Sequence, residues 1–449
     1  MASMAEQLAS NLNFNTFSKA EDLKKRLWFT LGALLVFRLG SYIPLPGIDT
    51  AIMADIAAQH SGGFLGIFDR FSGGALSRMS IFALGVMPYI SSSIIMQLMT
   101  IVSPQLEALK KEGESGRKKI NQYTRFGTVV IGCIQGYLMV VGLEALVGTA
   151  GNHVVIDPGM FFRLVGTITI VGGTLFLMWL GEQITSRGIG NGISLIIFSG
   201  IVASLPHAVV STLELNRTGA LRPHETLIIL VLAVAVIAFV VFMERSQRKI
   251  LIQYPKRQVG MKMMGGQSTH LPIKINSAGV IPPIFASAII GMPITIIAFM
   301  AGKGEGGGIA TIANYLSPGK PLYYILFIAL IVFFAFFYTA IIFNPEETAE
   351  NLKKNGGFVP GYRPGIATAE YFDYTLTRLT VIGAAYLAAV CTLPELIISQ
   401  YNVPFYLGGT SLLIVVGVGM DTISQIQSHL LAHQYEGLIK KSRLGGRKG

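Results

Sequence analysis

The sequence has little charge for its length. Only 13% of its 449 residues are Asp, Glu, Lys or Arg, whereas soluble domains carry about 25%. About half of the residues are apolar (51%), and the mean hydropathy is +0.57. A soluble fold could not cover so much apolar surface, and a disordered or collagen-like chain would not have this composition. The composition therefore indicates a polytopic membrane protein.

Residues that carry covalent or metal chemistry are also scarce. The two cysteines, Cys133 and Cys391, lie in apolar runs and are expected to be buried thiols. The seven histidines are scattered, and no zinc-protease, nucleophile-elbow or Walker-A motif occurs. The glycine-rich run 188–192 resembles a phosphate loop but lacks its lysine, so we interpret it as a tight turn between helices. We expect no catalytic residues, no metal and no cofactor, and the energy for any uphill work must come from a partner.

Ten apolar stretches are close to the length that crosses a bilayer. They are Leu27–Ile43, Ile81–Val102, Thr128–Val147, Phe161–Leu180, Gly192–Leu205, Leu227–Met243, Ala278–Met300, Tyr323–Phe343, Leu379–Ile398 and Pro404–Ile423. Five precede and five follow the loop near residues 206–224, an arrangement common in transport proteins built from two inverted halves. The sequence predicts an all-α membrane protein with ten helices in two pseudo-symmetric halves.

Basic residues predict the orientation. With ten spans, 27 of the 35 Lys and Arg residues fall on the side that holds both termini, and 6 fall on the other side. Cytoplasmic loops carry an excess of Lys and Arg, so both termini are expected in the cytoplasm.

The spans contain few ionisable groups. Arg38, Glu144, Arg163 and Glu182 are the candidates, and for the two arginines we favour side chains that reach toward an interface. No central acidic pair of the kind found in ion-coupled carriers occurs, which argues against a secondary solute transporter without excluding it. An intramembrane enzyme is disfavoured because no nucleophile and base, and no metal cluster, are apparent.

Four features of the sequence suggest a function. The loops 244–276 and 344–377 are long and basic, which fits either a docking surface or ordinary topological charge. The outer segment Gly62–Gly74 is amphipathic and too short to span, which fits either an interfacial helix or a re-entrant element. Val86 and Ile90 are one helical turn apart, which fits either ordinary packing or a dewetting constriction.

Six sequence segments resemble the SecY family, the central subunits of the Sec protein-conducting channel. They are FSGGALSRMSIFALGVMPYISSSIIMQL (71–98), KKEGESGRKKINQYTR (110–125), MWLGEQITSRGIGNGISLIIFSGIVA (178–203), QSTHLPIKINSAGVIPPIFA (267–286), FNPEETAENLKKNGGFVPGYRPG (343–365) and VPFYLGGTSLLIVV (403–416). The resemblance implies a pore between the two halves that translocates unfolded polypeptides and releases transmembrane segments laterally.

The resemblance also implies particular site residues. An aliphatic pore ring would comprise Val86, Ile90, Ile197, Ile284 and Ile414. A plug would occupy 62–74, with Phe64, Phe68, Asp69, Arg70 and Phe71. A lateral gate would involve Ser91, Asn276 and Ile289, and partners would dock on Arg363, Lys256, Arg257 and Lys274.

The implied partners are the SecE and SecG membrane subunits, the SecA ATPase, the ribosome through its RNA, signal peptides, nascent polypeptides and the lipid bilayer. The implied location is the bacterial cytoplasmic (inner) membrane. The expected divisions are a cytoplasmic N-terminus (1–26), a first half (27–205), an outer hinge loop (206–224), a second half (225–427) and a cytoplasmic tail (428–449).

Overall fold

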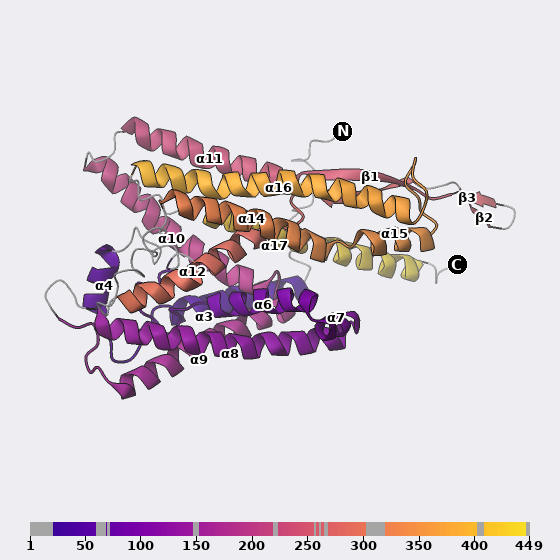
Figure 1. Cartoon of the computed structure of the whole chain (residues 1–449). Helices are drawn as coiled ribbons and strands as arrows, with labels where there is room; N and C mark the ends of the chain where they lie inside the picture. Colours follow the sequence, from indigo (N-terminus) through magenta and orange to yellow (C-terminus); the bar gives the residue numbers. More distant parts are fainter. Residues whose placement is uncertain are drawn as a thin grey trace. The chain divides into compact units, whose positions relative to one another are not determined.

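A computed structural model describes residues 21–59, 69, 72–146, 152–218, 223–255, 257–259, 262–264, 268–301, 319–401 and 408–445. The fold is mostly helical, and each expected span coincides with a helix (Figure 1). The helices that overlap the expected spans are α3 (Glu21–Gly40), α6 (Met87–Val102), α8 (Glu114–Ala145), α9 (Met160–Arg187), α10 (Gly192–Arg217), α11 (Pro223–Arg245), α12 (Ile281–Ala301), α14 (Pro321–Ile342), α16 (Ile366–Tyr401) and α17 (Gly409–Gly445), and the second span begins with a turn before Met87. Shorter helices are α4 (Thr50–Gln59), α7 (Pro104–Lys111) and α15 (Pro345–Lys354).

Within the described residues, seven helices are long and apolar enough to cross a membrane. They lie in α8, α9, α10, α11, α14, α16 and α17, while Met87–Val102 and Ile281–Gly291 are shorter apolar helices. The α11 window is only 6% buried inside the protein. Such a surface is stable only against lipid or another apolar partner.

The chain divides into two compact units. One comprises Met1–His207, Met292–Asn314 and Val418–Gly449, and the other comprises Ala208–Gly291 and Tyr315–Gly417. In the first unit α8 packs against both α6 and α9, and in the second α14 packs against α16. The boundary after His207 falls within the expected hinge loop 206–224, but α10 continues through it to Arg217; the ends of α12 and α17 group with the first unit.

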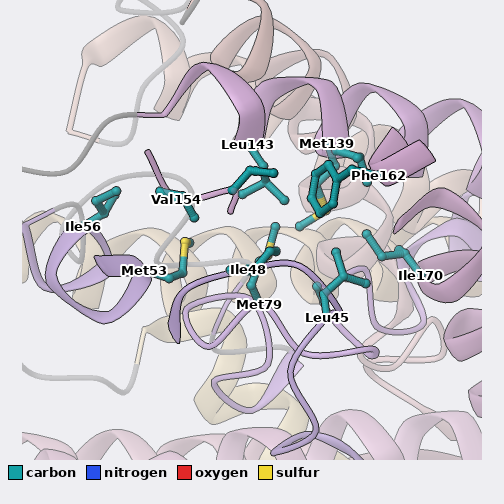
Figure 2. Close-up of a cluster of buried hydrophobic side chains, with 13 residues drawn as sticks. Leu45, Ile48, Met53, Ile56, Met79, Met139, Leu143, Val154, Phe162 and Ile170 are labelled. Atoms are coloured by element: carbon teal, nitrogen blue, oxygen red, sulfur yellow. The ribbon is translucent and has the colours of Figure 1, made fainter. Parts of the chain in front are cut away.

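A hydrophobic core of the first unit joins the chain after α3 to helices α8 and α9. Figure 2 shows Met139 and Leu143 of α8 gathered with Phe162 of α9 around Leu45 and Ile48. Each such side chain contributes about 1.5–3 kcal/mol when it is removed from water. This packing holds both α4 and the non-helical chain between α3 and α4 against α8 and α9.

The loop 244–276 contains β structure that sequence reasoning did not predict. Strand β1 (Gln247–Gln253) pairs antiparallel with β4 (Ser268–Lys274), and β2 (Arg257–Val259) pairs with β3 (Lys262–Met264). Ile250 and Ile252 are buried and their neighbours are exposed, which is the period-2 pattern of a half-buried strand. This alternation in the sequence could have predicted the strand. The result is a stiff ribbon that begins directly after α11 (Figure 1).

Candidate channel constriction, gate and docking loops

Three of the five expected ring residues lie together in the first unit. Val86 is the N-cap of α6, and the amide of Ile90 donates a hydrogen bond to its carbonyl at 3.1 Å, so the two residues lie one turn apart. Ile197 comes from α10. All three are buried, and they line one pocket together with Ser72, Leu84 and Met87 among others. Apart from Ser72, the side chains that line it are apolar and offer water no hydrogen-bond partners.

The other two expected ring residues belong to the second unit. Ile284 is half-buried in the first turn of α12, and Ile414 is fully buried on α17. The five-membered ring as a whole therefore stays a prediction.

The turn 188–192 sets where α10, and with it Ile197, begins. The Asn191 side chain accepts hydrogen bonds from the amides of Ile193 and Ser194 at 3.1 and 3.4 Å. A side chain at Gly192 would lie 1.9 Å from the carbonyl oxygen of Gly181, so α9 and α10 approach each other directly. The glycines thus permit the close helix approach that the sequence suggested.

The same turn is bound by two helices distant in the sequence. The Ile189 amide donates to the Thr30 hydroxyl of α3 at 3.1 Å, and the Gly190 amide donates to Gln425 of α17 at 2.8 Å. These bonds satisfy amides that precede the first turn of α10. They hold the glycine-rich turn against α3 and α17.

Most of the expected plug lies outside the described residues, including Phe64, Phe68, Arg70 and Phe71. Asp69 is described, and its carboxylate accepts hydrogen bonds from the Ser77 amide and hydroxyl, both at 2.8 Å. The Ser72 hydroxyl donates to the Asp69 carbonyl at 3.0 Å and accepts from the Leu76 amide at 3.3 Å. The carboxyl-terminal end of this segment is therefore a hydrogen-bonded turn beside the pocket.

The expected gate residues are divided between the units. Ser91 lies buried on α6 in the first unit, and Ile289 lies exposed on α12 in the second. Asn276 is buried, and its amide donates to Glu244 at the end of α11 at 2.6 Å and to the Gly279 carbonyl at 3.1 Å. Asn276 thus ties the base of the β-ribbon to α11 within its own unit, and its role as a gate contact stays a prediction.

Arg363 is exposed on a conformationally constrained turn. Gly361 and Gly365 flank it with φ angles of +90° and +111°, a region that favours glycine. The Thr368 hydroxyl donates to the Arg363 carbonyl at 2.8 Å, and Tyr362 stacks on Tyr371 with ring centroids 4.3 Å apart. The guanidinium is thereby presented to solvent from a rigid support.

Two of the other three expected docking residues, Arg257 and Lys274, lie in strands of the loop 244–276. Lys274 is exposed at its base and pairs with Gln247. Arg257 lies in β2, and Lys256 lies outside the described residues. Their contacts with any partner stay predictions.

The two long loops are joined to each other, which sequence reasoning did not predict. Gln253 of β1 and Phe358 exchange two backbone hydrogen bonds of 2.9 and 3.0 Å. Beneath them Ile250, Val359 and Phe372 pack in one hydrophobic cluster. The ribbon and the Arg363 turn therefore form one composite surface.

Two interhelical ion pairs use the charges found within the spans. Arg163 pairs with Glu144 at 2.6 Å, and Arg125 pairs with Glu182 at 2.6 Å through a bidentate contact. Arg163 therefore has a buried carboxylate partner and is not directed freely toward an interface. In the described part of the chain, no three His, Cys, Asp or Glu side chains come together as metal ligands.

The expectation for the cysteines was half wrong. Cys391 is buried, but Cys133 is exposed on the outer face of α8. A position within an apolar run predicts an apolar environment. On a membrane helix that environment can be lipid instead of protein.

Comparison with known proteins gives the family of the chain. The sequence model of SecY matches residues 80–423. The chain is 56% identical to the protein translocase subunit SecY of Vibrio cholerae over 432 residues, covering 96% of both chains, and 55% identical to that of Escherichia coli K12, covering 95% of this chain and 96% of the relative. The chain belongs to the SecY family. It is a bacterial membrane protein and a channel subunit of the protein translocase, not an enzyme.

Solved structures support the same fold at much lower identity. A protein-conducting channel superposes with a TM-score of 0.66 at 19% identity, covering 91% of this chain and 92% of that chain. Sec61 in a canine ribosome–channel complex superposes with a TM-score of 0.62 at 18% identity, covering 91% and 92%. The ten-helix architecture of SecY-family channels is thus consistent with the helices found here.

Proposed function

We propose that Val86, Ile90 and Ile197, with Ile284 and Ile414, close the waist of the channel through which unfolded polypeptides cross the membrane. The observation that supports this is that Val86 and Ile90 at the start of α6 and Ile197 of α10 line the same pocket. A narrow aliphatic ring gives water and ions no hydrogen-bond partners, so their passage through it costs several kcal/mol. An extended polypeptide fills the ring, and aliphatic side chains close around almost any cargo sequence.

The waist is tested by resting ion conductance of the reconstituted translocase. Ile90→Ser places a hydroxyl in the pocket and should raise the conductance, because water and ions gain a partner there. Ile95→Ser is the matched control on the same helix, since Ile95 is exposed on its outer face. Equal conductance of Ile90→Ser and the unmodified channel would remove Ile90 from the waist.

The segment 62–74 is proposed as the plug that closes the waist from outside. Its described end supports this, since Ser72 lines the pocket beside Val86 and Ile90. Deleting residues 62–74 should therefore also raise resting conductance. A channel that stays sealed after the deletion would assign the segment to the membrane interface instead.

A lateral gate between α6 and α12 is proposed to receive signal peptides and release transmembrane segments into the lipid. Ser91 and Ile289 are its expected facing residues, and polar contacts across such a seam contribute about 1 kcal/mol. Pro293 within α12 weakens that helix and assists its displacement. Cysteines at positions 91 and 289, in a variant lacking Cys133 and Cys391, should crosslink and block transport; a crosslinked channel with full activity would place the seam elsewhere.

The composite surface of the two loops is proposed as the cytoplasmic docking site. Arg363 would engage the SecA motor, and Lys256, Arg257 and Lys274 would contact SecA or ribosomal RNA. The support is the rigid, exposed presentation of Arg363 and the basic ribbon beside it. Ribosome binding should weaken as salt rises, because phosphate contacts release counterions. This surface would face the cytoplasm together with both termini.

SecE and SecG are the proposed membrane partners. The sparse burial of α11 supports the presence of such partners or of lipid, since its window is only 6% buried within this chain. Co-purification from membranes tests the assignment directly. Isolation of a stable chain without small membrane subunits would contradict it.

A further inference from the structure

Two arginines converge on one backbone carbonyl next to a residue that lines the pocket. Arg38 Nη1 donates to the Gly73 carbonyl at 2.7 Å, and Arg78 Nη2 donates to the same oxygen at 2.9 Å. Tyr42 supports both: Arg38 Nη2 donates to its hydroxyl at 3.0 Å, and the Arg78 guanidinium lies over its ring, 4.2 Å from the centroid. Two cationic donors on one acceptor are stronger than ordinary backbone hydrogen bonds.

The position that they hold leaves no room for another side chain. Gly73 has a φ angle of +68°, and a Cβ there would lie 2.9 Å from the Cα of Gly200 on α10. The backbone at Gly73 therefore touches the helix that supplies Ile197. Its neighbour Ser72 lines the same pocket as Val86, Ile90 and Ile197.

The two guanidiniums have no carboxylate partner among the ion pairs of the described residues. Arg38 lies near the end of α3, in the first expected span. A cation in such a place is costly unless donors find acceptors. Here the acceptors are a carbonyl and a tyrosine. In the part of the chain that the structure describes, both guanidiniums therefore bind one backbone carbonyl and neither forms a salt bridge.

We propose that Arg38 is a positioning residue of the channel: together with Arg78 and Tyr42 it clamps Ser72–Gly74 as the outer wall of the constriction, and so sets the balance between the sealed and the open channel. The inference rests on the proposed constriction. A conformational equilibrium shifts by the difference in interactions between its two states. Loss of the Arg38 bonds should therefore favour opening by about tenfold, which corresponds to about 1.4 kcal/mol.

The test compares three variants of the full translocase complex in planar bilayers and in an export assay. Arg38→Gln removes the charge and should raise resting ion conductance. It should also raise export of a reporter with a shortened hydrophobic signal, because less binding energy is then needed to open the channel. Arg38→Lys keeps a cationic donor and should restore much of the seal. Arg163→Gln is the control, since it breaks the pair with Glu144 in the same unit without touching Gly73.

Each result decides the matter. Leak and relaxed signal selection in Arg38→Gln but not in Arg163→Gln support the clamp. A sealed Arg38→Gln channel, or equal leak from both variants, overturns it. If Ile90→Ser leaks while Arg38→Gln does not, the constriction stands and only the clamp falls; if neither leaks, the constriction itself is wrong. If Arg38→Gln does not accumulate in membranes, Tyr42→Phe, which removes only the hydroxyl, is measured in its place under the same criteria.

Discussion

Arg163 and Glu144 join helices α8 and α9 through a buried carboxylate. Arg163 Nε and Nη2 lie 2.8 and 2.6 Å from Oε2 of Glu144, whose other oxygen accepts from the Gly159 amide at 3.1 Å. The Glu144 side chain is only 10% exposed, whereas that of Arg163 is 34% exposed. The carboxylate thus caps the start of α9 and pairs with its first turn, a favourable place for negative charge.

Removing the arginine should destabilise the complex, because it leaves that carboxylate buried without its charge partner. We expect Arg163→Gln to lower the thermal unfolding midpoint of the detergent-solubilised complex by a few degrees. Glu144→Gln in the same chain should recover part of the loss. Lys111→Gln serves as control, since its pair with Glu107 is largely exposed and such pairs contribute little. Equal shifts for both arginine and lysine variants would contradict the special role of burial.

The close approach of α9 and α10 predicts a strict size limit at Gly192. Because a Cβ there would lie 1.9 Å from the Gly181 carbonyl oxygen, Gly192→Ala must push the helices apart, and overpacking of this kind costs about 1–3 kcal/mol or more. Ile197 would shift with α10, so transport should fall together with the yield of folded complex. Gly172→Ala is the control on α9, because nothing lies within 4 Å of the added carbon. Alanine there should be neutral or stabilising, and a normal Gly192→Ala complex would refute the limit.

The shared cluster beneath the two loops predicts that they lose order together. Phe372 is fully buried beside Ile250 and Val359, and Phe→Ala at such a site costs about 3–5 kcal/mol. Phe372→Ala should therefore expose both the ribbon and the Arg363 turn to limited proteolysis while the membrane helices remain intact. Ile366→Ala is the control, since Ile366 is 82% exposed at the start of the same helix. Cleavage in only one loop would show that the two are independent.

Charge reversal at Arg363 should separate docking from folding. Arg363→Glu leaves the supporting bond from the Thr368 hydroxyl to the residue 363 carbonyl in place. We expect ATP-driven secretion to fall by an order of magnitude or more, since one attractive contact becomes repulsive, with an unchanged amount of complex in membranes. Lys354→Glu is a nearby control on α15, because Lys354 is exposed and paired only within its helix to Glu350. Normal secretion in Arg363→Glu would remove this residue from the docking site.

The parts of the candidate site were predicted on different grounds. Val86 and Ile90 share a helix face by spacing, and Ile197 joined them through the resemblance; the structure brings all three to one pocket. The β-ribbon was not predicted, although Ile250 and Ile252 alternate with polar residues as in a half-buried strand. The alternation is short, and the basic residues around it were explained by membrane topology alone. The joining of Gln253 to Phe358 carries no local signal, since it pairs backbone groups from distant loops.

The order of the residues alone was enough to predict a polytopic membrane protein of the SecY family, because long apolar runs, basic asymmetry and family segments are properties of the chain in order. Which groups the few charged side chains contact became clear only from the folded structure. Arg38 meets the carbonyl of Gly73 and Arg163 meets Glu144, while Cys133 faces outward and Cys391 inward. Hydropathy reports the free energy of transferring a side chain out of water. It does not distinguish a lipid neighbour from a protein neighbour, and it does not say which polar groups pair with each other. Those choices depend on directional contacts among helices that are remote in the chain.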